Sequence, residues 1–305
     1  MVIIIFAPLL SPADEGSSAS LEQLLFKARQ TRGVNFPPAV EYVYPRLTLA
    51  VRTTAITCPL NCAHCGGHYL RGMVSVTKAL IQQQKNRYKS FLVSGACNAQ
   101  GRVPHREKWP EICALAARGE LNIHSGLVGE EEAAELGKVA RTISFDFVTD
   151  AETIREVYGL HASPEDYLRS YRLLRKRCRV VPHICLGLMG GRIKGEYRAL
   201  EVLKEEGVEA ISFIVFRPTP GTALGHCPPP LLEEVARVLA FARVTFPNTP
   251  LYLGCLRPGG QYRQQLDCLA LHAGINKIVQ PAPAARRLAE KLELAVHRGE
   301  ECCAL

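Results

Sequence analysis

The sequence predicts an α/β fold in which eight parallel strands, each followed by a helix, close into a (β/α)8 barrel of the TIM type. From residue 47 onward, short β-branched runs alternate with amphipathic segments, which is typical of parallel strands joined by crossover helices. Eight such pairs follow one another, and a closed barrel of this kind usually has about 250 residues. The last two predicted strands are short, so an open (β/α)6 barrel is the alternative.

The elements of the predicted barrel follow from apolar periodicity and from the turn residues between them. The predicted strands span residues 47–57, 90–96, 120–125, 142–148, 179–188, 210–217, 251–256 and 277–280. The predicted helices include residues 111–117, 130–140, 164–176, 197–206, 231–246, 261–273 and 283–297. Pro283 suits the first turn of the last helix.

The first 46 residues have a different pattern. Residues 2–10 are an apolar run, residues 11–20 are a polar linker, and residues 21–32 have helical spacing. We therefore divide the chain into an N-terminal arm and helix, 1–46, and a barrel with a C-terminal cysteine tail, 47–305. The apolar run has no cationic flank and is about half the length of a membrane span. We expect a cytoplasmic protein that does not enter a membrane.

The composition argues against a nucleic-acid partner. The net charge of +8 is small for 305 residues, and no block of Lys and Arg resembles a nucleic-acid-binding tail. A cation-rich stretch lies at residues 169–179. It is either a solvated helix face or a docking site for an acidic electron donor or carrier domain.

Three cysteines within eight residues indicate a metal site. Cys58, Cys62 and Cys65 form a Cys-x3-Cys-x2-Cys triplet directly after the first predicted strand. A [4Fe–4S] cluster takes four ligands, so three cysteines leave one iron open to another ligand. A zinc site usually has two separated ligand pairs, and a disulfide scaffold needs more cysteines than twelve in 305 residues. Incidental clustering of buried thiols is the third alternative.

This loop resembles the cluster loop of the radical S-adenosylmethionine (SAM) superfamily, Cys-x3-Cys-x-Φ-Cys, with His64 at position Φ. The order of residues 94–97, 216–222 and 254–258 is most similar to biotin-synthase homologues, which include the two-protein lipoyl synthases of archaea and some bacteria. The resemblance covers residue 47 to the C-terminus. No Cys-x4-Cys-x5-Cys motif precedes the triplet, unlike in single-protein lipoyl synthases.

The resemblance implies how SAM is held at the carboxyl ends of the strands. The second strand end would hold the amino group and carboxylate of SAM, although the acidic residue usual there is absent. Asp146 shares a face with Ser144 and would bind the ribose, whereas Asp150 better suits a helix cap. A Gly-rich region after the fifth strand would contact adenine. The implied cofactor-binding residues are His64, Ser94, Gly95, Asp146, Gly190 and Glu196.

Two arginines are the predicted catalytic residues. Arg217 ends the sixth predicted strand, on the face of Phe213 and Val215, and should point inward to a carboxylate or substrate. Arg257 follows the seventh strand on the face of Cys255, at the barrel mouth. His183, on the fifth strand, suits either a core position or a ligand.

The remaining cysteines suggest a second iron–sulfur cluster. Cys255 and Cys97 fall at predicted strand ends, and a tail with Cys302 and Cys303 could fold back over the mouth. We expect Cys255, Cys302 and Cys303 as ligands, with Cys97 as the possible fourth. Tail thiols without a function are the alternative.

The resemblance also implies an activity. One electron from a ferredoxin-like donor would reduce the cluster, and SAM would be cleaved to methionine and a 5′-deoxyadenosyl radical that abstracts hydrogen. We expect sulfur insertion into a protein-bound octanoyl chain, with a second radical SAM protein and an octanoylated carrier domain as partners. Other radical SAM chemistry (a methylase, a mutase or carbon–carbon bond formation) and a noncatalytic, metal-stabilised binding barrel are the alternatives.

Overall fold

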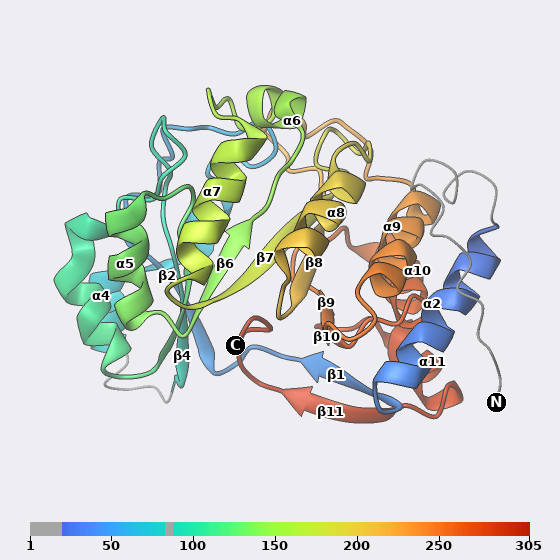
Figure 1. Ribbon diagram of the computed structural model, residues 1–305. Coiled ribbons are helices and arrows are strands. Elements are labelled where there is room, and N and C mark those ends of the chain that lie inside the picture. The colour runs from blue at the N-terminus through green and yellow to red at the C-terminus, as the bar shows by residue number, and fades with distance from the viewer. Residues whose placement is uncertain (1–19, 83–87) are drawn as a thin grey trace.

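One curled, all-parallel sheet organises the fold in the computed structural model, which describes residues 20–82 and 88–305. Within these residues the sheet has eleven strands in the order β11-β1-β10-β9-β8-β7-β6-β5-β4-β2-β3. Figure 1 shows helices covering the convex side of the sheet, which curves into a half-barrel. The predicted α/β class is confirmed.

The eight predicted strands all form, in the predicted order, and each pairs in parallel with the next. They are β2 (Thr48–Arg52), β4 (Ser90–Ser94), β5 (Glu120–His124), β6 (Thr142–Asp146), β7 (Arg179–Leu186), β8 (Ile211–Val215), β9 (Leu251–Leu253) and β10 (Lys277–Val279). The sequence therefore predicted the order of these strands, although most are shorter than expected.

The sheet does not close into an eight-stranded barrel among the described residues. The strand β1 (Ala39–Val43) pairs with β10 on one side and with β11 (Ala295–Gly299) on the other. At the opposite edge, β3 (Val74–Ser75) pairs with β2. The expected pairing of β10 with β2 is absent because β1 takes the edge of β10. The sequence prediction missed β1, β3 and β11.

All the predicted helices form, the last of them shorter than predicted. The helices of the described residues are α2 (Leu21–Asn35), α3 (Val76–Gln82), α4 (Trp109–Ala116), α5 (Glu130–Val139), α6 (Ala151–Glu156), α7 (Pro164–Arg175), α8 (Glu196–Glu206), α9 (Leu232–Thr245), α10 (Gly260–His272) and α11 (Pro283–Lys291). Of these, α3 and α6 were not predicted. Two short 3-10 helices, η1 (His68–Gly72) and η2 (His105–Lys108), are also present. Asp150 caps α6 by accepting a hydrogen bond from the Thr153 amide (2.8 Å), as expected for that residue.

The last helix is shorter than predicted. It ends at Lys291 rather than residue 297, and the chain then forms β11. Glu293 has a left-handed backbone conformation (φ 54°), which interrupts the helix. The following residues pair with β1, so tertiary strand pairing overrides the helical pattern of this segment.

The N-terminal part contributes to the same sheet. The predicted helix at 21–32 is confirmed as α2, which begins with a capping box at Ser20 and Gln23. The apolar run at 2–10 and the linker up to residue 19 lie outside the described residues. β1 falls within the predicted N-terminal part, 1–46, yet it is hydrogen-bonded into the sheet.

The two faces of the sheet have opposite character. Side chains that face the helices are apolar and fully buried, as for Phe91, Ile123 and Phe213. Because side chains alternate along a strand, their neighbours face the interior of the half-barrel. Many of these are polar: Ser90, Asn122, His124, Ser144, Asp146, His183 and Ser212. TIM barrels usually fill this space with branched apolar residues, so the polar interior is a departure with functional consequences.

The C-terminal tail fills the end of the half-barrel formed by the amino ends of the strands, which we call the floor. The Cys302 amide donates to Thr48 Oγ1 (2.7 Å), the Lys277 ammonium donates to the Cys303 carbonyl (3.3 Å), and Arg179 donates to the Ala304 carbonyl. Thr48, Lys277 and Arg179 are the first residues of β2, β10 and β7. The tail was expected over the mouth, at the opposite ends of the strands, and this prediction is wrong. In Figure 1 the C-terminus lies between β4 and β9.

Among the described residues, no helix combines the length and apolar character that crossing a bilayer requires.

Deleting residues 302–305 should lower the free energy of unfolding of the metal-free chain by about 3 kcal/mol. The deletion removes three hydrogen bonds between tail backbone atoms and the strands, each worth about 1 kcal/mol, and the weaker bond from Asn122 Nδ2 to Cys302 Sγ. Chemical denaturation of the full and truncated chains measures the difference, with Leu305→Ala as the control that keeps all three bonds. An unchanged denaturation midpoint for the truncated chain contradicts the role of the tail as a floor.

Candidate metal centre and adjoining cavities

The cysteine triplet lies on a tight loop at the carboxyl end of β2. The loop reverses direction through three residues of positive φ, Asn61 (45°), Gly66 (49°) and Gly67 (72°). The Asn61 amide donates to the Cys58 carbonyl (3.2 Å), and the Gly66 amide donates to the Cys62 carbonyl (2.9 Å). These turns explain how a short segment can present several thiols in one direction.

The side chains of Cys62, His64 and Cys65 form a compact ligand group. Their ligand atoms all lie within 4.8 Å of one another, and the group is the one such set of three among the described residues. A hydrogen bond from the Cys62 thiol, reinforced by His64, lowers the pKa of Cys65 to about 4, which favours a thiolate. The same bond and burial raise the pKa of Cys62.

The third cysteine of the triplet lies outside this compact group. The Cys58 thiol is 3.8 Å from the carbonyl oxygen of Cys97. The three thiols still come from one loop, and thiolate donors of this kind suit an iron–sulfur cluster. The buried Nδ1 of His64 has no hydrogen-bond partner in the described structure. An unpaired buried nitrogen beside thiols fits a site that a bound group completes.

Neighbouring segments hold the loop in place. The Ala63 amide donates to the Val157 carbonyl (2.7 Å), and the Ala63 carbonyl accepts from the Leu224 amide (2.9 Å). The Tyr158 ring packs edge-on against His64, with 5.4 Å between ring centroids. These contacts come from segments far apart in the chain, and the sequence analysis identified none of them.

A cavity beside the loop brings together three of the predicted cofactor-binding residues. Ser94, Gly95 and Asp146 line it, together with Cys97 and Tyr158. A side chain at Gly95 would collide with its surroundings, since a Cβ atom there would be 2.8 Å from a methyl carbon of Val103. Packing alone therefore requires glycine at this position.

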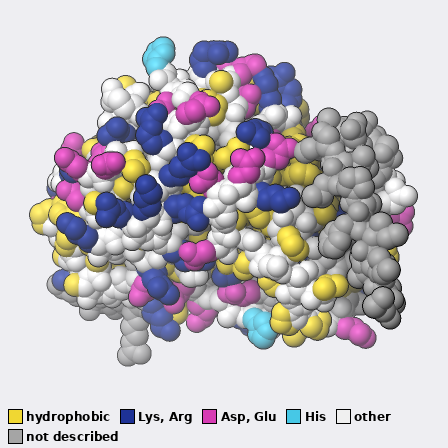
Figure 2. All heavy atoms as spheres, in the orientation of Figure 1, with side chains coloured by type: hydrophobic (Ala, Val, Ile, Leu, Met, Phe, Trp, Pro, Cys, Tyr) yellow, Lys and Arg dark blue, Asp and Glu magenta, His cyan; other side chains and the backbone are white. Residues whose placement is uncertain are grey.

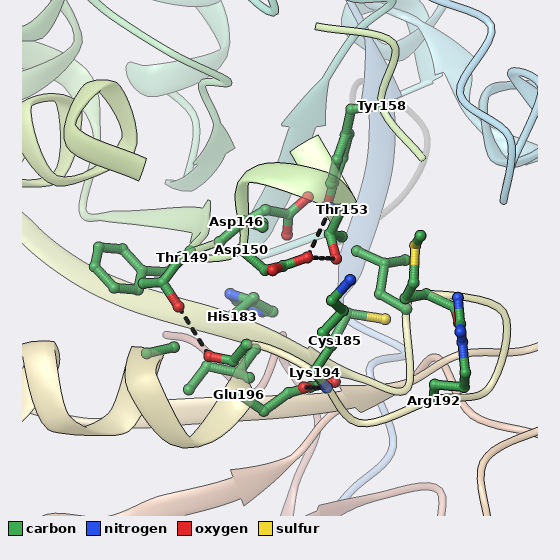
Figure 3. Close-up of a pocket in the computed structure, with 17 residues that line it drawn as sticks. Asp146, Thr149, Asp150, Thr153, Tyr158, His183, Cys185, Arg192, Lys194 and Glu196 are labelled. Carbon is green, nitrogen blue, oxygen red and sulfur yellow. Dashed lines mark hydrogen bonds between the residues drawn. The ribbon is translucent and has the colours of Figure 1, made fainter. Parts of the chain in front are cut away.

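A second cavity adjoins the first and shares Asp146 and Tyr158 with it (Figure 3). Figure 3 shows His183, Cys185 and Glu196 among the residues around it. The Glu196 carboxylate accepts hydrogen bonds from the amides of Gly187 (2.7 Å) and Lys194 (2.6 Å). Glu196 therefore braces the 187–195 loop, which is an indirect contribution to the predicted adenine site.

The predicted Gly190 lies on the same loop as the residues that Glu196 braces. It has a left-handed conformation (φ 62°), which favours glycine. Its neighbour Met189 lines the second cavity, whereas Gly190 is not among the lining residues.

Asp146 occupies the position where the two cavities meet. It is accessible through the cavities, yet protein surrounds it, and burial raises the pKa of its carboxyl group while His183 and His64 oppose this shift. His183 is the register partner of Asp146 on β7. The alternative role as a helix cap belongs to Asp150, so the structure supports the inward orientation predicted for Asp146.

Three histidines lie near the cavities, of which His105 and His183 are buried and His124 is half-buried. Burial lowers the pKa of His105, His124 and His183 to about 4 each, so all three are neutral at pH 7. The rings of His124 and His183 are 5.6 Å apart. His105 is bonded on both ring nitrogens, to Thr53 Oγ1 (3.3 Å) and to the His124 carbonyl (3.0 Å). His124 was missed, although strand alternation with Asn122 could have indicated it.

The prediction that Arg217 points inward relied on the wrong face of β8. Phe213 and Val215 pack into the core between sheet and helices, so their face of β8 points away from the interior. Arg217 follows the end of β8 and is exposed. Burial raises the pKa of Tyr69, and the positive charge of Arg217 opposes this shift. Arg217 therefore lies near η1, the segment that contains Tyr69 and follows the three cysteines.

Arg257 does not face the mouth. It is fully buried, and its Nε and Nη2 atoms donate to the two carboxylate oxygens of Asp267 (2.7 and 2.9 Å). Its Nη1 donates to the Gly254 carbonyl (2.6 Å), and Nη2 also donates to the Val279 carbonyl (2.8 Å). All of its nitrogens therefore bind protein acceptors, which gives Arg257 a structural setting rather than the predicted catalytic one.

The cysteines predicted for a second cluster fall into two places. Cys302 and Cys303 are hydrogen-bonded to each other, and Cys302 Sγ accepts from Asn122 Nδ2 (3.3 Å). Cys255 is exposed and lies just beyond the carboxyl end of β9, where burial by the surrounding protein and the charge of Cys302 raise the pKa of its thiol. Cys97 instead lies beside Cys58, which is on the loop that carries the cysteine triplet. The structure thus brings Cys302 and Cys303 together at the amino ends of the strands, whereas Cys255 and Cys97 follow the carboxyl ends of β9 and β4.

Comparison with curated proteins gives one likeness over most of the chain. It is 24% identical over 287 residues to the biotin synthase of Neorickettsia sennetsu, which covers 88% of this chain and 85% of that protein. A shorter match, 31% identical over 129 residues, covers 39% of this chain and 24% of the uncharacterized protein MK0932 of Methanopyrus kandleri. No protein-family model matches the chain.

Solved structures share the fold. Methylornithine synthase (PylB) has a TM-score of 0.65 at 15% identity, covering 91% of this chain and 89% of its own. The FeFe-hydrogenase maturase HydG from Carboxydothermus hydrogenoformans has a TM-score of 0.63 at 14% identity (87% and 68%). Streptococcus suis SuiB bound to SAM has a TM-score of 0.53 at 12% identity (73% and 52%).

The likeness to a biotin synthase agrees with the predicted radical SAM, biotin-synthase-like character of the chain. The structural likenesses concern the fold, because the identities are low. The predicted resemblance to lipoyl synthase subunits stays a prediction.

The buried histidines predict a pH dependence of stability. Above pH 6.5 a histidine is neutral in both the folded and the unfolded chain. Between pH 6.5 and about 4 the unfolded chain binds a proton that folded His105 excludes, so the free energy of unfolding falls as the pH falls. We expect His105→Gln to reduce this fall by up to about 3 kcal/mol.

Chemical denaturation at several pH values tests this expectation. The control is His297→Gln, which changes an exposed histidine on β11 and should leave the slope unchanged. Equal slopes for His105→Gln and the unmodified chain would show that His105 is not the source.

Proposed function

We propose that the chain is a radical SAM enzyme that cleaves SAM reductively and abstracts a hydrogen atom from a substrate held inside the half-barrel. One observation carries the proposal. The loop that carries Cys58, Cys62 and Cys65, which we call the thiol loop, adjoins two cavities that meet at Asp146. The fold is shared with a protein whose structure contains SAM. In open α/β folds of this kind, ligands bind at the carboxyl ends of the strands.

Each part of the site has a distinct task in this proposal. Cys58, Cys62 and Cys65 would hold a [4Fe–4S] cluster, which with SAM on its open iron supplies one-electron cleavage of SAM to methionine and a 5′-deoxyadenosyl radical. Asp146 offers a carboxylate to the ribose hydroxyls. Glu196 fixes the loop that borders the second cavity. The surrounding protein excludes water, which protects a radical from side reactions.

The cysteines on the floor suggest sulfur insertion as the reaction. Cys302 comes from the tail, which lies at the amino ends of the strands, and the thiol loop lies at their carboxyl ends. A substrate inside the half-barrel would therefore lie between two groups of thiols. Cys255, Cys302 and Cys303 are chemically suited to hold a second iron–sulfur cluster that supplies sulfur.

The finer identity of the reaction rests on the sequence resemblance. We propose an octanoyl chain on a carrier domain as the substrate, with a second radical SAM protein as partner and a cytoplasmic location. Another radical SAM reaction that uses the floor thiols differently is compatible with the same site. A noncatalytic binding barrel would keep the metal but would not cleave SAM.

Anaerobic reconstitution with iron and sulfide tests the first part of the proposal. The unmodified chain should bind at least about four irons and form 5′-deoxyadenosine with dithionite and SAM. Replacing Cys58, Cys62 and Cys65 by Ala together should abolish the product. Asp146→Asn should keep the iron but weaken SAM binding about tenfold, since a charged hydrogen bond is lost. Iron binding without any 5′-deoxyadenosine would favour the noncatalytic barrel.

Iron content also tests the second cluster. We expect about eight irons per chain, falling to about four when Cys255, Cys302 and Cys303 are replaced by Ala together. Cys178→Ala, at a cysteine beside α7, is the matched control and should keep all the iron. A triple variant with unchanged iron content would exclude a second cluster on these residues. Mass analysis of an octanoylated carrier peptide, with and without a second radical SAM protein, identifies the substrate.

A further inference from the structure

Acidic and basic residues are distributed unevenly along the chain. Between Tyr42 and Arg106 there are nine Lys and Arg residues and no Asp or Glu. The remaining residues hold the other 28 cations and all 29 acids, so they are nearly neutral. The net charge of +8 therefore originates in residues 42–106, which we call the acid-free segment.

The acid-free segment surrounds the thiol loop. It includes β2, the loop, η1, β3, α3 and β4, which together form one end of the sheet. Because β3 pairs with the last residues of β2, η1 and the first turn of α3 lie at the same end of the strands as the loop. Arg71 in η1 and Lys78 in α3 are the exposed cations there.

The positive charge near the loop is not neutralised. Neither Arg71 nor Lys78 makes an ion pair with any residue in 20–82 or 88–305. Arg102 and Arg106, at the end of the acid-free segment, pair with three glutamates of α5 at 2.6 to 3.1 Å. Within the acid-free segment, Arg71 and Lys78 are therefore the exposed cations beside the loop that remain available to a partner.

The cation-rich stretch on α7 is a weaker docking site than its sequence suggests. Figure 2 shows Asp and Glu side chains interspersed with the Lys and Arg side chains on the face in view. Arg169 pairs with Asp166 (3.0 Å), and Arg172 and Arg175 both pair with Glu206 (2.5 and 3.8 Å). The stretch ends at Arg179, the first residue of β7. It therefore runs toward the floor of the half-barrel, away from the thiol loop.

Exposed apolar residues accompany the free cations. Ile56 directly precedes the loop and is 49% exposed, and Pro59 within the loop is also exposed. A small apolar contact with charges around it is typical of weak protein interfaces, such as those between redox partners. A small anion would use the cations but would have no need of the apolar residues.

We propose that Ile56, Pro59, Arg71 and Lys78 form the docking surface for an acidic one-electron carrier protein. This inference rests on the proposed function, because the partner would be oxidised as one electron passes to the metal group on the adjacent cysteines. The cations would steer an acidic partner to the loop by long-range attraction. The surface therefore suits an electron donor that is a small protein with an acidic face.

The experiment compares two reductants on the reconstituted chain. A reduced bacterial ferredoxin with an acidic surface needs the docking surface, whereas dithionite does not. Arg71→Glu with Lys78→Glu should weaken ferredoxin binding about tenfold at low salt and should slow ferredoxin-driven formation of 5′-deoxyadenosine. Dithionite-driven formation and iron content should be unchanged. Lys176→Glu with Lys291→Glu, an equal charge change at two exposed positions near the floor, is the matched control.

Each outcome decides the proposal. The proposal is supported if ferredoxin binding weakens only in the Arg71 and Lys78 double variant and weakens further when Ile56→Ser is added. The difference from the unmodified chain should also shrink at high salt. Equal losses in both double variants would indicate net charge alone and overturn the proposal, as would ferredoxin binding equal to that of the unmodified chain. If the Glu variant loses iron, Arg71→Gln with Lys78→Gln replaces it. Absence of 5′-deoxyadenosine with dithionite contradicts the proposed function itself, and direct ferredoxin binding still tests the surface.

Discussion

The pairing of β1 with β10 is the constraint on which the rest of the architecture depends. Once β1 occupies that edge, β10 cannot pair with β2, and the eight central strands cannot close on themselves. The chain returns through β11 on the other side of β1 and then enters the half-barrel as the tail. The tail joins both sides of the opening, since the Leu47 amide donates to the Glu300 carbonyl (2.9 Å) and Lys277 binds the Cys303 carbonyl.

This arrangement produces a polar interior with two chemically different ends. Apolar residues on the outer face of each strand form the core with the helices, so the inner residues are free to serve ligands. The thiol loop and Asp146 lie at the carboxyl ends, and the tail thiol of Cys302 lies at the floor. Some inner groups satisfy each other, as Ser144 does with Asn122 (2.9 Å), while Ser212 Oγ is buried without a partner in the described structure. Unpaired buried groups are uncommon in stable interiors.

The candidate site could be predicted only in part. Spacing alone identified the three cysteines, and strand alternation correctly turned Asp146 inward and left Asp150 as a cap. Alternation was wrong for Arg217 because the neighbours on its face pack against helices, and it was wrong for Arg257 because that residue lies beyond the end of β9. A buried guanidinium needs a compensating carboxylate, and nothing in the local pattern indicates that Asp267 supplies it.

Short-range features of the sequence were sufficient for the order of the eight central strands, for the main helices and for the thiol loop. These features depend on periodicity and spacing within a few turns of the chain, so they are present before the chain folds. The closure of the sheet, the position of the tail and the partners of Arg257 were decided only in the tertiary structure. The Cys302 amide, for example, bonds to Thr48 at the other end of the chain, and a hydrogen bond between such distant residues leaves no periodic trace in the sequence around either of them.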